Sequence, residues 1–190
     1  MKRKLLLHIC CAPCAVYVFE KLNREFDVTG FFYNPNIHPR EEYEFRKAEI
    51  SKISRRHHWK TLYGKYDMND WFQCIKGHEK QPERGSRCPI CFRMRLKKTF
   101  DQARKDGHDI VATTLSISPY KVTRQINNEG IRLSREFGIE FLAENFKKQD
   151  GFNICRKMAH EQGIKHQDYC GCVYSRVEKI LKTRKIRITY

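Results

Sequence analysis

Cysteine is the residue type in this sequence whose spacing most clearly suggests chemistry. Seven of the nine cysteines fall into three short groups, separated by long stretches of chain. Because thiolates bind metals and exchange electrons, this clustering predicts a metal or redox centre. The isolated Cys74 and Cys155 are expected to be small buried apolar side chains. We name the clusters the first thiol group (Cys10, Cys11 and Cys14), the second thiol group (Cys88 and Cys91) and the third thiol group (Cys170 and Cys172).

The second thiol group has the spacing of a metal-binding pair. Two cysteines separated by two residues can bind one metal centre, and the amides of a helix N-terminus would stabilise their negative charge. Alone, this motif fits a zinc site, a redox dithiol or half of an iron–sulfur site. Seven clustered thiols exceed the four ligands that one zinc ion requires, and two zinc sites would need an unusual ligand spacing.

The adjacent residues Cys10 and Cys11 favour a centre larger than one zinc ion. A cubane cluster is wide enough for neighbouring residues to bind different irons where a strand turns into a helix. We therefore assign a [4Fe–4S] cluster to Cys10, Cys11, Cys88 and Cys91. Cys14 lies one helical turn further on and should border the cluster. In the competing partition, Cys14 or a member of the third thiol group replaces one of the four ligands.

The third thiol group could act as a redox dithiol or bind a second metal. Gly171 separates its two cysteines and permits dihedral angles that relieve the strain of closing so small a ring. Asp168 and Tyr169 stand beside the pair and could supply a carboxylate ligand or a proton. We therefore predict catalytic roles for Cys170, Cys172, Asp168 and Tyr169.

The composition predicts a folded, basic protein that binds nucleic acid. The 190 residues are 40% hydrophobic, enough for a packed core, and no apolar run approaches the roughly 20 residues of a membrane span. We expect a soluble, cytoplasmic protein without a membrane partner. Lys and Arg number 38 against 22 Asp and Glu, and the net charge of +16 favours a polyanionic partner. A basic surface without such a partner is the alternative.

Basic residues also gather locally, and aromatic residues are available to stack on bases. Tyr33, Trp71 and Tyr120 are candidates for stacking, although each is equally able to be part of the core. The basic groups are Lys52/Arg55/Arg56, Arg93/Arg95/Lys97/Lys98 and Lys179/Lys182/Arg184/Lys185/Arg187.

Short apolar runs alternate with helical patterns along the chain. Alternation of this kind predicts parallel strands joined by right-handed crossovers. We therefore expect one α/β domain over 1–190, a three-layer Rossmann-like (HUP-like) sandwich with a mostly parallel sheet and a helical C-terminal part at about 150–190. Strands are predicted at 4–9, 28–33, 61–66, 108–115 and 139–143, and helices at 13–26, 41–56, 89–105, 122–137, 153–162 and 174–183.

The strand order along the chain also places the first thiol group. In parallel α/β sheets, ligands bind beyond the carboxyl ends of the strands, and Cys10 and Cys11 follow the first predicted strand directly. His8, two residues earlier, would face the same side of that strand as Cys10. It is either a core histidine or a further candidate for a proton donor.

Five segments of the sequence resemble the epoxyqueuosine reductases of the QueH type. Together they span nearly the whole chain, and their combination is far more specific than any single Cys-x-x-Cys motif. The segments are 5–14 (LLLHICCAPC), 31–39 (FFYNPNIHP), 82–96 (PERGSRCPICFRMRL), 114–121 (TLSISPYK) and 167–175 (QDYCGCVYS).

The resemblance implies a cobalamin-independent oxidoreductase that removes the epoxide oxygen of epoxyqueuosine in tRNA. It also implies a [4Fe–4S] cluster on Cys10, Cys11, Cys88 and Cys91. The third thiol group looks like a redox-active pair or the ligands of a neighbouring mononuclear iron. The expected partners are the anticodon stem-loop of epoxyqueuosine-containing tRNA, held by the basic surface, and an electron donor that the sequence does not identify.

Two other functions fit part of the pattern. One is an iron–sulfur-dependent tRNA thiolation enzyme, a class that generally activates the base with ATP. The sequence contains neither a Gly-x-x-x-x-Gly-Lys-Ser/Thr motif nor a Gly-x-Gly-x-x-Gly motif after a strand, which disfavours nucleotide-driven chemistry. The other is a zinc-binding protein that binds RNA without catalysis.

Overall fold

The fold of the computed structural model is organised around a parallel sheet. The structure describes residues 1–187, and side chains up to Thr183. The strand order is β3-β2-β1-β4-β5, and every neighbouring pair is parallel. The strands are β1 (Lys4–Ile9), β2 (Asp27–Phe32), β3 (Thr61–Tyr63), β4 (Ile110–Thr113) and β5 (Glu140–Phe141).

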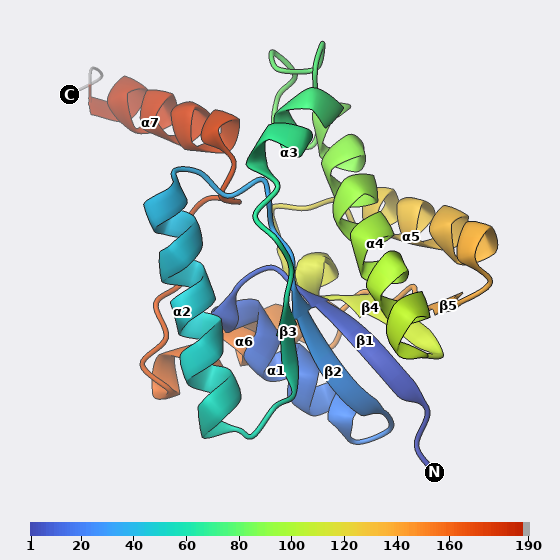
Figure 1. Cartoon of the computed structure of the whole chain (residues 1–190). Helices are drawn as coiled ribbons and strands as arrows, with labels where there is room; N and C mark the ends of the chain where they lie inside the picture. The colour runs from blue at the N-terminus through green and yellow to red at the C-terminus, as the bar shows by residue number, and fades with distance from the viewer. Residues whose placement is uncertain (188–190) are drawn as a thin grey trace.

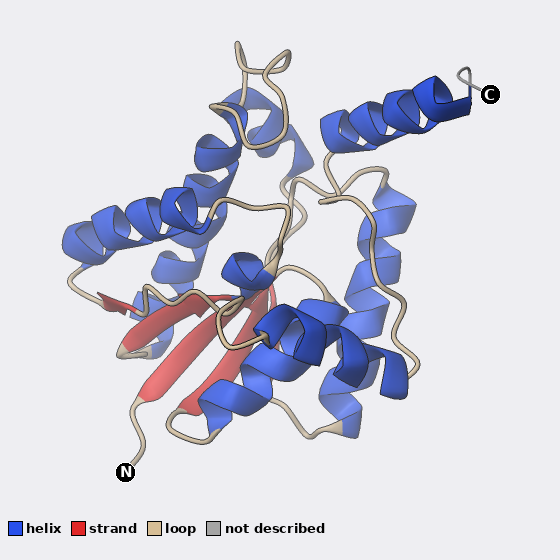
Figure 2. Ribbon diagram, turned by 180° about the vertical axis from the view of Figure 1, so that it is seen from behind, coloured by secondary structure: helices blue, strands red, loops and turns tan. Residues whose placement is uncertain are grey.

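Helices cover both faces of this sheet, which confirms the predicted α/β sandwich (Figures 1 and 2). One face packs against α1, α2 and α6, and the other packs against α4 and α5. Hydrophobic layers on both sides bury β1 and β2 beyond their first residues, Lys4 and Asp27. These helices are α1 (Ala12–Asn23), α2 (Arg40–Arg56), α4 (Arg87–Asp106), α5 (Thr123–Phe137) and α6 (Gly151–Glu161).

The central strand β1 shows how the sequence produces this arrangement. Successive side chains of a strand point to opposite faces, so Leu5 and Leu7 pack against α1 while Leu6 packs against α4. All three side chains are fully buried. The uninterrupted apolar run is therefore explained by burial on both faces, and it ends where the first thiol group begins.

Several predicted elements differ from the structure at their ends, and one helix was not predicted. The third strand ends at Tyr63 rather than at residue 66, and the fourth ends at Thr113, after which η1 (Thr114–Ile117) forms a short 3-10 helix. Helix α3 (Met68–Cys74) was not predicted, because seven residues carry too little periodicity to be recognised. Tertiary packing of the buried Trp71 holds this helix against α4.

The two isolated cysteines behave differently from each other. Cys155 is buried, and its thiol donates a hydrogen bond to the carbonyl oxygen of Pro13 at 2.9 Å, as expected for a core residue. Cys74 is exposed at the end of α3, so the prediction of a buried side chain was wrong there. The short helix buries Trp71 and turns Cys74 toward solvent.

After β5, the described part of the chain contains helices α6 and α7 (Val173–Arg187). Helix α7 extends away from the sheet (Figure 1). The boundary of a helical C-terminal part near residue 150 stays a prediction. Among residues 1–187, no helix combines the length and the apolar character that crossing a membrane requires.

Candidate metal and redox site

Each of the three thiol groups lies at the beginning of a helix. Cys11 directly precedes α1, the second thiol group lies in the first two turns of α4, and Cys172 directly precedes α7. The free amides at a helix N-terminus carry partial positive charge, which stabilises thiolates. The fold therefore gives each group a favourable electrostatic position.

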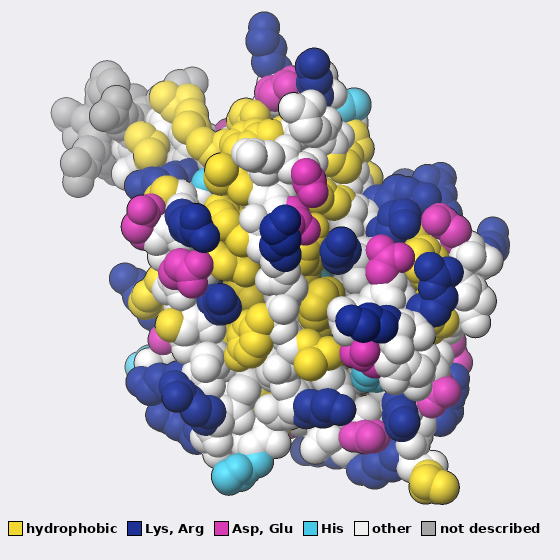
Figure 3. Space-filling view, viewed as in Figure 1, with side chains coloured by type: hydrophobic (Ala, Val, Ile, Leu, Met, Phe, Trp, Pro, Cys, Tyr) yellow, Lys and Arg dark blue, Asp and Glu magenta, His cyan; other side chains and the backbone are white. Residues whose placement is uncertain are grey.

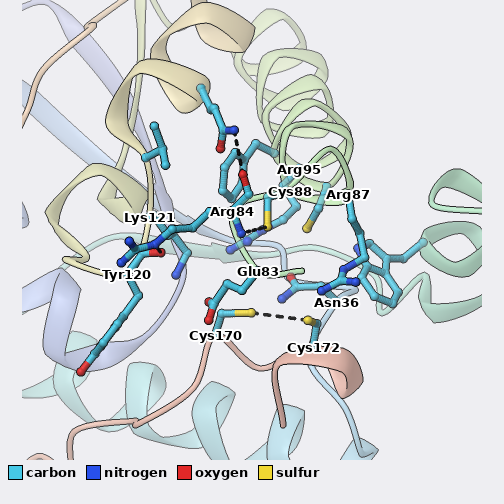
Figure 4. Close-up of a pocket in the computed structure, with 15 residues that line it drawn as sticks. Asn36, Glu83, Arg84, Arg87, Cys88, Arg95, Tyr120, Lys121, Cys170 and Cys172 are labelled. Carbon is cyan, nitrogen blue, oxygen red and sulfur yellow. Dashed lines mark hydrogen bonds between the residues drawn. The ribbon is translucent and has the colours of Figure 1, made fainter. Parts of the chain in front are cut away.

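Two cavities that share part of their walls bring the three groups together. The larger cavity, of about 520 Å³, is lined by the first thiol group and Cys170. The smaller one, of about 30 Å³, is lined by the second and third thiol groups. Glu83, Arg95, Tyr120 and Lys121 line both cavities (Figure 4). All seven clustered cysteines thus contribute to one connected region of the molecule.

The first thiol group brings three sulfur atoms close together. Its three Sγ atoms lie within 4.8 Å of one another, so the group could hold a metal ion. The Sγ atoms of Cys10 and Cys11 are 3.6 Å apart, and the Thr114 hydroxyl donates a hydrogen bond to Cys10 Sγ at 3.3 Å. Hydrogen bonds from Cys11 and Cys14 lower the pKa of Cys10, and the same contact raises the pKa of Cys11 to about 12. These contacts favour the deprotonated form of Cys10 over that of Cys11.

Both cysteines of the second thiol group have a raised pKa. Burial raises the pKa of Cys88 to about 11, although the backbone N–H of Arg84 donates a hydrogen bond to Cys88 Sγ at 3.3 Å. Burial also raises the pKa of Cys91, and nearby Arg95 and Trp71 oppose that shift. Binding of a metal would remove the protons from these thiols, because cysteine binds metals in its deprotonated form.

The third thiol group forms a close pair on the loop before α7. The Sγ atoms of Cys170 and Cys172 are 3.5 Å apart, and the Ser175 hydroxyl lies 3.1 Å from Cys170 Sγ. The contact with Cys172 lowers the pKa of Cys170 and raises that of Cys172. Gly171 between them has a φ of +103°, which a side chain would strain. The contact therefore favours the deprotonated form of Cys170 over that of Cys172.

Two cations, Arg46 and Lys121, lie near these thiols. Arg46 is 2% exposed, binds Glu42 at 2.7 Å and lies 5.0 Å from the ring centre of Tyr169. Burial disfavours the charge of Lys121, but the thiolates of Cys170 and Cys10 hold its pKa above the ordinary value. Positive charge near sulfur stabilises both thiolates and anionic metal–thiolate centres.

Four buried polar atoms around the smaller cavity have no hydrogen-bond partner among the described residues. They are Asn36 Oδ1, Trp71 Nε1, Arg95 Nε and Gln125 Oε1. Burying a polar atom without a hydrogen-bond partner lowers the stability of a protein. Four such atoms around one cavity therefore indicate that a bound group supplies their partners. Two of the four are N–H donors, which the sulfur atoms of an iron–sulfur centre would accept. The residues present therefore fit such a group.

Asp168 and Tyr169, two of the candidate proton donors, lie in different environments. The carboxylate of Asp168 is largely exposed and paired with Lys179, which lowers its pKa and keeps it ionised. The Tyr169 hydroxyl donates to the His38 carbonyl oxygen at 3.3 Å. Both residues line the larger cavity, and their catalytic roles stay predictions.

His8 has the character of a core histidine. Its ring nitrogens lie 2.9 Å from Thr113 Oγ1 and 3.1 Å from the Tyr33 carbonyl oxygen, and its side chain is fully buried. Burial lowers its pKa to about 3, with Arg95 contributing in the same direction. His8 is therefore neutral near pH 7 and positions β1 against its neighbours.

The three candidate stacking residues differ in their exposure to solvent. Tyr33 and Trp71 are buried, so of the two alternatives for these rings the structure shows the core. Tyr120 is 54% exposed and lines both cavities, so its ring is available at the entrance.

The predicted basic groups do not form one surface. Lys52 lies at the end of α2 remote from the thiols, and Arg95 is buried beside them. Lys179 and Lys182 line the larger cavity. On the face shown in Figure 3, Lys and Arg side chains are spread rather than gathered. The remaining members of the last group, Arg184, Lys185 and Arg187, have side chains outside the described residues.

Three charged residues of this site were missed by the sequence reasoning. Arg46, Glu83 and Lys121 resemble ordinary surface residues, and nothing in their type distinguishes them. Glu83 and Lys121 do fall in segments 82–96 and 114–121, which carry the family resemblance, and that position was the available signal. Their proximity to the thiols follows only from the fold.

Two solved structures share the fold at low sequence identity. One is described as a predicted subunit of tRNA methyltransferase from Methanocaldococcus jannaschii, with a TM-score of 0.53, 13% identity and coverage of 83% of this chain and 76% of that one. The other is the U34-tRNA thiolase NcsA from Methanococcus maripaludis with its [4Fe-4S] cluster, with a TM-score of 0.54, 11% identity and coverage of 92% and 61%. At these identities the likeness concerns the fold alone.

Sequence comparisons identify much closer relatives. The sequence profile described as "Epoxyqueuosine reductase QueH" matches residues 5–178. Proteins with that name from Acinetobacter baylyi, Streptococcus pyogenes and Thermotoga maritima are 40%, 37% and 35% identical. The matches cover 90%, 92% and 96% of this chain, and 80%, 71% and 95% of those proteins. The chain therefore belongs to the epoxyqueuosine reductase QueH family.

Proposed function

We propose that this chain reduces epoxyqueuosine to queuosine in tRNA, removing the epoxide oxygen as water. The observation that carries the proposal is the meeting of three distant thiol groups around two cavities that share part of their walls. Family membership supplies the substrate and favours reduction over the thiolation and zinc-binding alternatives.

The proposed cofactor is a [4Fe–4S] cluster bound by Cys10, Cys11, Cys88 and Cys91. Such a cluster supplies electrons one at a time when it is bound. The close sulfur atoms of the first thiol group, the helix N-termini and the unpartnered N–H groups support this assignment. Cys14 borders the proposed ligands and is the first candidate to replace one of them.

The third thiol group is proposed to exchange electrons beside the substrate. Opening the epoxide to an alkene requires two electrons and two protons and releases one water. Oxidation of Cys170 and Cys172 to a disulfide yields two electrons and two protons, so this reaction is balanced. An electron donor, not yet identified, would then return the disulfide to two thiols. Their 3.5 Å separation supports such a pair.

The alternative role for the third thiol group is to bind a second, mononuclear iron. In that arrangement Asp168 could supply an oxygen ligand, since its carboxylate also lines the larger cavity. The two roles differ in metal content. Binding of a second iron predicts about one iron per chain beyond the four of the cluster.

The larger cavity is proposed to receive the modified base of the tRNA anticodon stem-loop. Bases that undergo chemistry are extruded from their stack into a pocket, where aromatic side chains can cover them. The exposed ring of Tyr120 lies at the cavity wall, and Lys179 and Lys182 could contact phosphates. Affinity for RNA should therefore fall steeply with salt, because each neutralised phosphate releases counterions.

An anaerobic assay tests this function directly. Protein purified without air is mixed with epoxyqueuosine-containing RNA and a chemical reductant, and the nucleosides are analysed by mass spectrometry. We expect the loss of one oxygen atom from the modified nucleoside. An unchanged nucleoside in the presence of iron-loaded protein would overturn the proposal, and zinc as the sole bound metal would support the non-catalytic alternative.

A further inference from the structure

Glu83 is a carboxylate without a counter-ion in a cavity that is otherwise rich in cations. It lines both cavities and points toward Cys170 (Figure 4). Its own backbone N–H donates to the Glu178 carboxylate at 3.1 and 3.3 Å. Among the side chains described, no Lys, Arg or His nitrogen lies within 4.0 Å of the Glu83 carboxylate.

The other carboxylates of the larger cavity have cations of their own. Asp168 is paired with Lys179, and Glu178 binds Arg87 at 3.3 Å. Glu83 thus differs from its acidic neighbours, since its negative charge faces the cavity without a direct partner. Lys121 and Arg84 are the cations whose charge it feels from further away.

The surroundings of Glu83 disfavour its charged form. Burial raises the pKa of Glu83, and the negative charges of Cys170 and Glu178 act in the same direction. A half-buried charge surrounded in this way is stabilised when a cation enters and forms a charge-assisted hydrogen bond. The structure therefore provides an anionic position next to the thiols, available to a positively charged group.

The substrate class of the proposed function has one group of this kind. In epoxyqueuosine a secondary amine joins the base to the epoxide-bearing ring, and an alkyl amine is protonated near pH 7. Cations that attract the RNA backbone would repel this ammonium from the cavity. The unpaired carboxylate of Glu83 would attract this ammonium where the surrounding cations repel it.

We propose that Glu83 binds the ammonium of the modified base through its carboxylate. This inference rests on the proposed function and defines how the site selects its substrate. The epoxide begins on the ring carbon next to the one that bears the amine. Anchoring the amine at Glu83 therefore places the epoxide beside Cys170, toward which Glu83 points.

Binding measurements on the iron-loaded protein test the inference without turnover. Two anticodon stem-loop RNAs are compared, one with queuosine, which has the amine but no epoxide, and one with unmodified guanosine. We expect wild-type protein to prefer the queuosine RNA. Glu83→Gln, which keeps the shape but loses the charge, should reduce that preference about tenfold or more, the range of a charge-assisted hydrogen bond. Its affinity for the guanosine RNA should not change.

Glu79→Gln is the matched control, because Glu79 lies in the same loop but is exposed and outside both cavities. It should retain the full preference. Unchanged discrimination in Glu83→Gln, with iron content and melting temperature preserved, would overturn the inference. Glu83→Gln could also slow turnover while its preference for queuosine RNA stays unchanged. That result would assign proton donation to Glu83 and would also overturn the inference. Failure of the wild-type protein to convert epoxyqueuosine RNA would reject the proposed function separately, because the binding comparison requires no conversion.

Discussion

The first and third thiol groups differ in how the fold holds them. The first follows the central strand β1 and begins α1, so regular structure surrounded by core fixes its backbone. The third lies on the connection between α6 and α7. There the His38 N–H donates a hydrogen bond to the Gly171 carbonyl oxygen at 2.8 Å, and side-chain contacts supply the remaining support. A rigid backbone suits a resident metal centre. A loop suits a pair of thiols whose bonding changes during a reaction.

The two groups nevertheless share one electrostatic design. In each, hydrogen bonds from neighbouring thiols lower the pKa of one cysteine, Cys10 or Cys170, and raise that of its partner. Lys121 faces both of these thiolates. The comparison teaches that the two groups have similar electrostatic surroundings and differ in how far regular structure holds their backbone.

The largest effect should come from replacing single cysteines. Cys11→Ser should remove most of the iron and sulfide together with all turnover, because the first thiol group would hold the cluster. Cys172→Ser should keep the brown colour and the cluster iron, yet reduce turnover by more than about 100-fold, an effect typical of losing a reacting group. Iron and sulfide analysis and the mass-spectrometric assay check both. Loss of the cluster in both variants would remove the distinction between the groups.

A smaller effect is expected for the cation that supports the third thiol group. Arg46→Met removes the ion pair with Glu42 and the contact with Tyr169 but retains an apolar stem. Glu42 would then lack its partner, which should lower the free energy of unfolding by about 1–3 kcal/mol. Hydrogen exchange should become faster at 168–172 and stay unchanged at 10–14. Equal acceleration in both segments would contradict the comparison.

Gly171→Ala should loosen the third thiol group without affecting the first. The residue has a φ of +103°, and a Cβ there would lie 2.9 Å from Ile37 Cγ1. Strain of this kind costs about 1–3 kcal/mol. Gly163→Ala is the control, since its φ is +68° but a Cβ would meet nothing within 4 Å. Turnover should fall more in Gly171→Ala than in the control, with full iron content in both proteins.

The smallest effect concerns His8, which supports the first thiol group from within β1. An unfolded histidine binds a proton near pH 6.5, whereas folded His8 does so only near pH 3. Between these values the unfolded state binds more protons, so stability falls as the pH falls. The contribution approaches about 1.4 kcal/mol per pH unit below pH 6. Urea unfolding of the reduced, metal-free protein should show a shallower slope from pH 7 to pH 5 in His8→Gln. Equal slopes would contradict a neutral, buried His8.

A structural feature could be predicted from the sequence where neighbouring residues alone produce it. The strands β1 and β2 were predictable because central parallel strands bury both faces and read as continuous apolar runs. The thiol groups were visible because their spacing is unusual. Helix α3 was missed, since the burial of Trp71 against another helix stabilises it rather than any pattern within its seven residues.

The charges around the thiols could not be predicted in this way. Glu83 and Lys121 look like surface residues until the loops that carry them fold over the cavities. Conversely, Tyr33 and Trp71 look like candidates for base stacking until the core encloses them. Residue type predicts chemistry, but only tertiary structure determines which residues face a cavity.

The central claim is that three distant thiol groups form one metal and redox site. Its most direct test is a crystal structure of anaerobically purified protein, with anomalous diffraction recorded at the iron edge. We predict one cluster of iron atoms between Cys10, Cys11, Cys88 and Cys91, with Cys170 facing it across the cavity. Iron bound elsewhere, or only zinc on one isolated thiol group, would contradict the account.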